Sequence, residues 1–87
     1  HLSQPVVVDL GAGSGIFLER VLSKNKTAFC YWIDSSEAFL EIARQKLERY
    51  KGQVKFILSS METAWEQQIS QTPTFIFSMS AIRVIAR

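Results

Sequence analysis

The residues best suited to chemistry in this chain are three glycines and two aspartates. Gly11, Gly13 and Gly15 fall within five residues, and so dense a glycine run forms a tight turn rather than a helix or strand interior. Asp9 stands two residues before the first glycine, and Asp34 stands 19 residues after the last one. A glycine-rich turn after a first parallel strand is where nucleotide-like ligands bind, and the helix N-terminus that follows favours a carboxylate or phosphate.

Short apolar runs predict the elements that must position these residues. Residues 6–10 (VVVDL) form a β-branched run that ends at the glycines, as in a strand that is buried on both faces of a parallel sheet. Further strands are predicted over residues 27–33, 54–58 and 74–79. Helices are predicted from Phe17 to the polar residues 24–26, over 37–50 with Gly52 as its C′ residue, and over 62–69. Alternating strands and helices indicate an α/β fold, a parallel sheet with flanking helices and right-handed crossovers.

Composition and charge exclude several classes of protein. With 87 residues, 47% of them hydrophobic, we expect one folded domain or part of one. A formal net charge of +2 gives no clear nucleic-acid or membrane signal, and no apolar run approaches the ~20 residues of a membrane span. A single cysteine, Cys30, excludes an internal disulfide and a multi-cysteine metal site, and we expect an inert buried thiol there. No secretory signal pattern is visible, which favours a cytoplasmic protein.

The glycine spacing discriminates between two kinds of ligand. In the dinucleotide fingerprint G-x-G-x-x-G the third glycine falls on Ile16, which argues against a nicotinamide dehydrogenase. The stretch VVVDLGAGSG instead closely resembles the first motif of the Rossmann-like S-adenosylmethionine-dependent methyltransferases. The stretch WIDSSEAFLEIA, which begins at Trp32, is similar to that family's "G-I-D-x-S-x-x-M-L-x-x-A". The similarity runs from Val6 to Arg83 and covers about the first half of such a domain.

The resemblance implies S-adenosylmethionine as the cofactor and gives roles to the glycine loop and both aspartates. The loop backbone would lie against the methionine part of the cofactor. The loop residues predicted to bind it are Gly11, Ala12, Gly13 and Gly15. Asp9 would orient the amino group of the methionine part, and Asp34 would accept hydrogen bonds from both ribose hydroxyls. Structural alternatives stay open: Asp9 as a cap for backbone donors of the loop, and Asp34 as a cap for the following helix.

The resemblance also places the adenine end of the cofactor. Ser60 stands where the family usually has an acid beside the adenine amino group, and Met61 would lie next to the ring. Ser35 stands where an apolar residue often packs on adenine. The alternatives are a loop or cap role for Ser60 and core packing for Met61. Both tryptophans, Trp32 and Trp65, are expected in the core rather than against a ligand.

The last stretch of the chain is the region that borders the methyl-transfer site in the family. FIFSMSAIR resembles the pattern "D-x-I-x-S-x-x-A-I-H-H", with matches at Ser78, Ala81 and Ile82. Thr74 stands at the position of the acid, and Arg83 replaces the first histidine. No His/Asp or Cys/His pair suggests a catalytic base, so the catalytic residues and the methyl acceptor stay unassigned, and no metal site is predicted.

Together these patterns predict a Rossmann-like methyltransferase half-domain over residues 1–87, with strand order 3-2-1-4. In the family three more strands follow, so we expect a fragment that is the cofactor-binding half of the domain. The fourth strand would leave an exposed sheet edge, where association with a missing C-terminal half or another chain is expected. Two functions stay open: the cofactor-binding half of a methyltransferase, or a non-catalytic adenosyl-ligand-binding or structural remnant.

Overall fold

The computed structural model describes residues 4–60 and 65–78 of the chain. Its strands form one sheet in which every neighbouring pair is parallel. The strands are β1 (Val6–Leu10), β2 (Phe29–Asp34), β3 (Val54–Leu58) and β4 (Phe75–Ser78). Their order across the sheet is β3-β2-β1-β4, which confirms the predicted α/β fold class and strand order.

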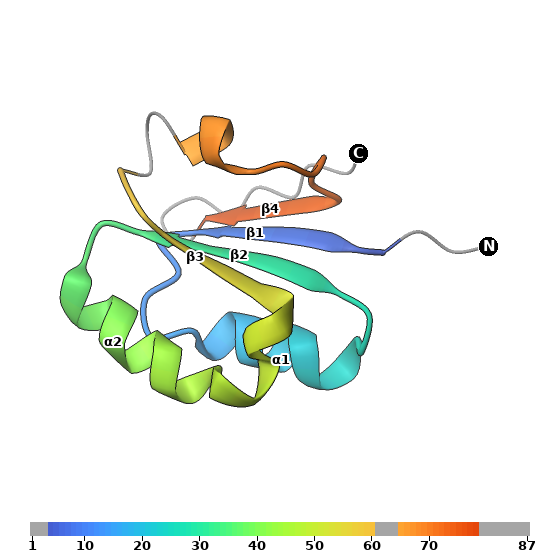
Figure 1. Ribbon diagram of the computed structural model, residues 1–87, viewed down its shortest axis with the longest axis horizontal. Helices are drawn as coiled ribbons and strands as arrows, with labels where there is room; N and C mark the ends of the chain where they lie inside the picture. The colour runs from blue at the N-terminus through green and yellow to red at the C-terminus, as the bar shows by residue number, and fades with distance from the viewer. Residues whose placement is uncertain (1–3, 61–64, 79–87) are drawn as a thin grey trace.

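The connections lie on both faces of the sheet. Helices α1 (Ile16–Lys24) and α2 (Glu37–Lys46) cover one face, and the short 3₁₀ helix η2 (Trp65–Gln68) lies on the other (Figure 1). From β1 the chain passes through α1 to β2 and through α2 to β3, each strand one place further out in the sheet. It then returns across the opposite face to β4 (Figure 1). This change of face follows from right-handed crossovers, since the direction of travel across the sheet reverses.

Two hydrophobic clusters, one on each face, hold the sheet between its covers. The cluster under α1 and α2 contains Val7, Ala12, Leu18, Leu22, Ala28, Cys30, Trp32, Ala43, Leu47 and Val54. The cluster on the η2 face contains Val6, Val8, Tyr31, Ile33, Ile57, Trp65 and Ile76. Successive residues of β1 and β2 alternate between the two clusters, as strand geometry requires. Both tryptophans lie in these clusters, as predicted.

The second helix ends earlier than its sequence pattern predicts. It ends at Lys46, and a 3₁₀ segment, η1 (Glu48–Gln53), follows it to β3. The side-chain amide of Gln53 donates to the carbonyl oxygens of Lys26 and Ala28 at 2.9 and 2.8 Å, which fixes the entry into β3. The prediction of Gly52 as a left-handed C′ glycine is wrong, because Gly52 lies inside η1 and is not among the positive-φ glycines.

The other boundaries differ by a few residues. β2 begins at Phe29, two residues later than predicted, and extends to include Asp34. Where the third helix was predicted, residues 65–68 form the 3₁₀ turn η2, residue 69 is not helical, and residues 62–64 lie outside the described residues. β4 ends at Ser78, and the predicted last residue of that strand, Met79, lies outside the described residues as well.

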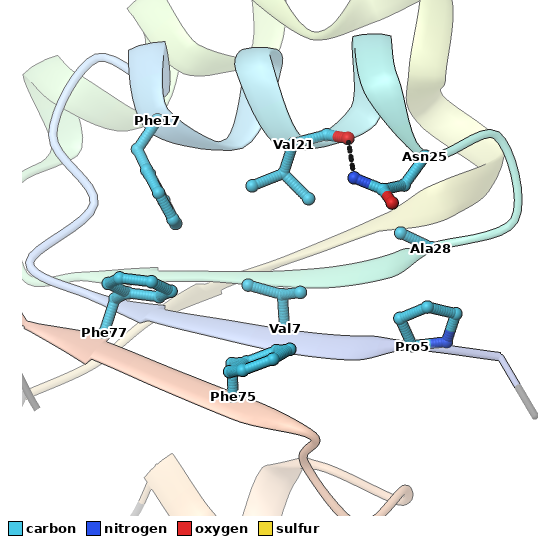
Figure 2. Close-up of a pocket in the computed structure, with 8 residues that line it drawn as sticks. All are labelled: Pro5, Val7, Phe17, Val21, Asn25, Ala28, Phe75 and Phe77. Carbon is cyan, nitrogen blue, oxygen red and sulfur yellow. Dashed lines mark hydrogen bonds between the residues drawn. The ribbon is translucent and has the colours of Figure 1, made fainter. Parts of the chain in front are cut away.

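One part of the helix face carries no helix in the described chain. Beside α1, an apolar groove of about 260 Å³ opens over β1 and β4 (Figure 2). It is lined by Pro5, Val7, Phe17, Val21, Asn25, Ala28, Phe75 and Phe77. A shallower depression of about 400 Å³ lies on the outer surface of α2 and η1, between Glu41 and Glu48. Neither hollow is lined by a predicted site residue.

Residues 4–60 and 65–78 contain neither a membrane-spanning helix nor a cluster of metal ligands. No helix in these ranges is long and apolar enough to cross a membrane. No group of three or more His, Cys, Asp or Glu side chains in these ranges is arranged to hold a metal ion.

Candidate cofactor site

The predicted glycine loop connects β1 to α1 at the carboxyl ends of the strands. Gly11, Gly13 and Gly15 have φ angles of 72°, 59° and 90°, all in the left-handed region that other residues rarely adopt. The three glycines are therefore required by the path of the backbone. Gly15 is also the N-cap of α1, and no side chain caps the first turn of this helix. The N-terminal N–H groups of α1 are thus available to a ligand at this end.

The end of β2 holds the loop through four polar contacts. The N–H groups of Gly11 and Ala12 donate to the carbonyl oxygen of Ile33 at 2.8 and 3.1 Å. The N–H of Gly13 donates to Oδ2 of Asp34 at 3.0 Å, and the indole Nε1 of Trp32 donates to the carbonyl oxygen of Gly13 at 2.8 Å. The first βα turn is therefore anchored to the neighbouring strand, and its conformation is set there.

Asp34 is fixed by backbone donors on both of its carboxylate oxygens. Besides the Gly13 contact at Oδ2, its Oδ1 accepts from the N–H of Ser36 at 3.0 Å. The helix cap itself is Ser36, whose hydroxyl accepts from the N–H of Phe39 at 3.1 Å. A carboxylate offers about four acceptor sites, and the Asp34 side chain is only partly buried, so acceptor capacity is left for a ligand. Its structural contacts thus leave room for the ribose role.

Asp9 has a different environment. It is 3% exposed and stands on β1 between Trp32 of β2 and Phe77 of β4, its partners in the two strand ladders. Burial and, to a lesser degree, the negative charge of Asp34 raise the pKa of the Asp9 carboxyl from 3.8 to about 7. In the described part of the chain no group donates a hydrogen bond to this carboxylate. The alternative that Asp9 caps loop donors finds no contact among the described residues: the N–H groups of Gly11 and Ala12 bond to Ile33, that of Gly13 to Asp34 and that of Gly15 to Ala12.

Gly13 and Gly15 serve different purposes. A Cβ at Gly13 would meet no atom within 4 Å, so this glycine presents open space at the surface of the loop. A Cβ at Gly15 would lie 3.2 Å from Cδ1 of Leu47 and 3.4 Å from Cβ of Ala43. Gly15 therefore allows the loop to pack against α2, whereas Gly13 leaves the loop backbone accessible.

The predicted adenine-binding residues are described only in part. Ser35 and Ser60 are both exposed, at the carboxyl ends of β2 and β3. The N–H of Ser59 donates to the carbonyl oxygen of Asp34 at 3.0 Å, which ties these two strand ends together. Met61 lies outside the described residues, as do Ala81, Ile82 and Arg83 of the last stretch of the chain.

Trp32 is the residue of this site whose role the sequence did not reveal. It is fully buried, as expected of a core residue, yet its indole N–H reaches the glycine loop. A signal was available, since a buried tryptophan N–H needs an acceptor and this one stands two residues before Asp34. Cys30, two residues further back on the same face, is a buried free thiol, as predicted. Burial and then the charge of Asp9 raise its pKa to about 12.

Comparison with known proteins identifies the family. The family model for a methyltransferase domain matches residues 7–87. The chain belongs to the methyltransferase-domain family. Trans-aconitate 2-methyltransferase of Variovorax paradoxus (strain S110) is 38% identical over 77 residues, which are 88% of this chain and 27% of that protein. Carboxy-S-adenosyl-L-methionine synthase 1 of Yersinia pseudotuberculosis serotype IB (strain PB1/+) is 37% identical over 51 residues, 59% of this chain and 21% of that protein.

Solved structures share the fold of this methyltransferase domain. TrmK of M. capricolum, solved with S-adenosylhomocysteine, has a TM-score of 0.75 at 20% identity, over 87% of this chain and 34% of that one. Coclaurine N-methyltransferase, bound to N-methylheliamine and S-adenosylhomocysteine, has a TM-score of 0.73 at 22% identity, over 90% of this chain and 23% of that one. The domain thus spans about a fifth to a third of the length of these proteins. Family membership supports the predicted cofactor, S-adenosylmethionine.

Proposed function

We propose that this chain is the cofactor-binding part of an S-adenosylmethionine-dependent methyltransferase. The observation that carries the proposal is the set of polar groups at the carboxyl ends of β1 and β2. Uncapped N–H groups at the start of α1 suit a carboxylate, and Asp34 with spare acceptor sites suits a diol. Asp9, which accepts no hydrogen bond from residues 4–60 and 65–78, suits an ammonium group. The cofactor carries these three groups on its methionine and ribose parts.

The chain's own contribution to methyl transfer is to hold the donor in place. S-adenosylmethionine, when bound, supplies a methyl group on a sulfonium, and transfer to a nucleophile by in-line displacement leaves a thioether. The glycine loop is fixed by β2 and Asp34 is fixed by Gly13 and Ser36, so the site is ordered before the ligand arrives. Such preorganisation aligns donor and acceptor, and no residue of this chain is proposed as a general base. The acceptor is left unassigned.

Calorimetric titration of the 87-residue chain with S-adenosylmethionine, S-adenosylhomocysteine and NAD tests the proposal. We expect micromolar or weaker affinity for the first two and none for NAD, since Ile16 replaces the third glycine of the dinucleotide fingerprint. Circular dichroism of the same sample establishes that the chain is folded. A folded chain that binds none of the three ligands would support the structural remnant instead.

A role for the free edge of β4 is proposed as well. Among the strands of residues 4–60 and 65–78, β4 pairs with β1 alone. Phe75, on the helix face of β4, is 37% exposed beside the apolar groove of Figure 2. We propose that further strands join here, from the remainder of a longer protein or from a second copy. Phe75→Glu should then reduce self-association of the chain in sedimentation velocity, whereas Phe39→Glu, at a 43% exposed site on α2, should not.

The location proposed for the protein is the cytoplasm. The chain carries one cysteine, buried and free, and therefore no internal disulfide of the kind that stabilises many secreted domains. Fractionation of cells that carry a tagged copy tests this location. Recovery of the protein from a membrane or extracellular fraction would contradict it.

A further inference from the structure

Two side chains of β2 form hydrogen bonds with the same residue of the glycine loop. Trp32 Nε1 donates to the carbonyl oxygen of Gly13 at 2.8 Å, and Oδ2 of Asp34 accepts from the N–H of Gly13 at 3.0 Å. The two side chains are two residues apart on one strand, so they project from the same face of the sheet. Gly13 therefore has both of its backbone polar groups engaged by side chains.

The Trp32 side chain is rigidly seated. It is 0% exposed in the cluster under α1 and α2, and its ring centroid lies 5.8 Å from that of Phe56. A buried indole N–H without an acceptor is costly, and the Gly13 carbonyl is its hydrogen-bond acceptor here. The core therefore fixes the indole, and the indole fixes the carbonyl.

Packing does not restrict the conformation of Gly13. Its φ of 59° is left-handed, and a Cβ at this position would meet nothing within 4 Å. A glycine with open space around it samples many conformations unless its polar groups are held. The orientation of the Gly13 peptide groups thus depends on Trp32 and Asp34.

We propose that Trp32 is a positioning residue for the cofactor: its indole N–H holds the Gly13 carbonyl so that the glycine loop is preset for the methionine part of the ligand. The inference rests on the proposed function. This role differs from core packing, because the contribution of Trp32 to ligand affinity comes from the indole N–H hydrogen bond and not from the volume of the ring.

The test uses both tryptophans of the chain. Trp32→Phe keeps an aromatic ring and removes the N–H, and Trp65→Phe is the matched control in the cluster on the opposite face. We expect Trp32→Phe to bind S-adenosylhomocysteine about 3–10-fold more weakly, as the loss of one hydrogen bond would give. Trp65→Phe should bind within about twofold of the unchanged chain, since Trp65 packs in the cluster on the opposite face of the sheet.

A spectroscopic measurement follows the indole itself. Trp65→Phe leaves Trp32 as the single tryptophan, because the chain contains two. If Trp32 positions the loop, its emission should change on titration with S-adenosylhomocysteine, with the same dissociation constant that calorimetry gives. This measurement decides the question even where Trp32→Phe does not fold.

The outcomes separate the inference from the proposed function. Equal affinity of folded Trp32→Phe and the unchanged chain would overturn the inference and leave the proposed function intact. If the emission of Trp32 stays constant while calorimetry detects binding of the ligand, the inference is overturned as well. A folded, unchanged chain that does not bind S-adenosylhomocysteine would overturn both.

Discussion

Asp9 and Asp34 lie at the same edge of the sheet, yet their surroundings are opposite. Asp34 accepts hydrogen bonds from two backbone N–H groups and is partly exposed, whereas Asp9 is 3% exposed and accepts none from the described residues. Burial disfavours the ionised form of Asp9 and raises the pKa of its carboxyl to about 7. The fold thus supplies hydrogen-bond donors to Asp34, whereas residues 4–60 and 65–78 supply neither a donor nor a positive charge to Asp9. In the proposed function a bound ammonium group would be the partner of Asp9.

The largest expected effect is on stability, at Asp9. Its pKa is raised in the folded state, so the folded chain binds the proton more tightly than the unfolded chain between pH 4 and 7. The Asp9 contribution to stability is therefore greatest below pH 4 and is lost as the pH rises to about 7. Asp9→Asn should remove this loss and raise the free energy of unfolding at pH 8 by roughly 3–4 kcal/mol, with little change at pH 4.

Urea unfolding of both chains at pH 4, 6 and 8 measures this difference. Glu37→Gln, at an exposed site in the first turn of α2, is the control and should follow the unchanged chain. An Asp9→Asn curve parallel to that of the unchanged chain across this range would show that Asp9 is ionised without cost.

The next largest effect is on ligand affinity, at Asp34. Asp34→Ala removes the acceptor proposed for both ribose hydroxyls and releases the N–H of Gly13, so affinity for S-adenosylhomocysteine should fall about 100-fold. Stability should fall by roughly 1–3 kcal/mol, because Gly13 and Ser36 lose a charged acceptor. Calorimetry and urea unfolding report the two effects separately. If the folded variant keeps its affinity for S-adenosylhomocysteine, Asp34 does not bind the ribose hydroxyls.

Gly13 and Gly15 offer a similar contrast in the backbone of the loop. Gly15→Ala should cost roughly 2–3 kcal/mol, since the left-handed φ is strained and the new Cβ approaches Leu47 and Ala43. Gly13→Ala introduces only the backbone strain, so the free energy of unfolding should fall by about 1 kcal/mol. Its new Cβ, however, projects into the open space where the ligand would lie. Thermal unfolding should thus rank Gly15→Ala as the less stable chain. Titration should show that Gly13→Ala loses ligand affinity out of proportion to its stability.

The smallest expected effect is the pH dependence of binding. An ammonium group beside Asp9 favours its ionised form, so affinity for S-adenosylhomocysteine should rise about eightfold from pH 6 to 7.5 as Asp9 ionises around pH 7. Methylthioadenosine lacks the amino-acid part and should change less than about twofold over the same range. If the affinities of both ligands depend on pH equally, Asp9 does not interact with the amino group of the ligand.

Much of the fold was predictable because the strands are short, apolar and bounded by clear turns. β1 and β3 have the predicted bounds, and the strand order followed from the family resemblance. The early end of α2 was not predictable, since the amide of Gln53 fixes that connection to the carbonyls of Lys26 and Ala28, which are distant in sequence. The density of glycines was enough to predict the tight turn after β1, whereas the cofactor roles of the loop and of both aspartates came from the family resemblance. The Trp32 contact with Gly13 was missed, because the need of a buried indole N–H for an acceptor does not say which carbonyl, 19 residues away in the sequence, will meet it.

The most direct test of the account is an NMR titration of the ¹⁵N-labelled chain with S-adenosylhomocysteine. The account predicts that the largest amide shifts fall on residues 11–15 and 34–36, at the ends of β1 and β2. Amides around the apolar groove, such as those of Val21 and Ala28, should stay in place. Shifts that gather around the groove, with the glycine loop unmoved, would contradict the claim that the loop and Asp34 form the cofactor site.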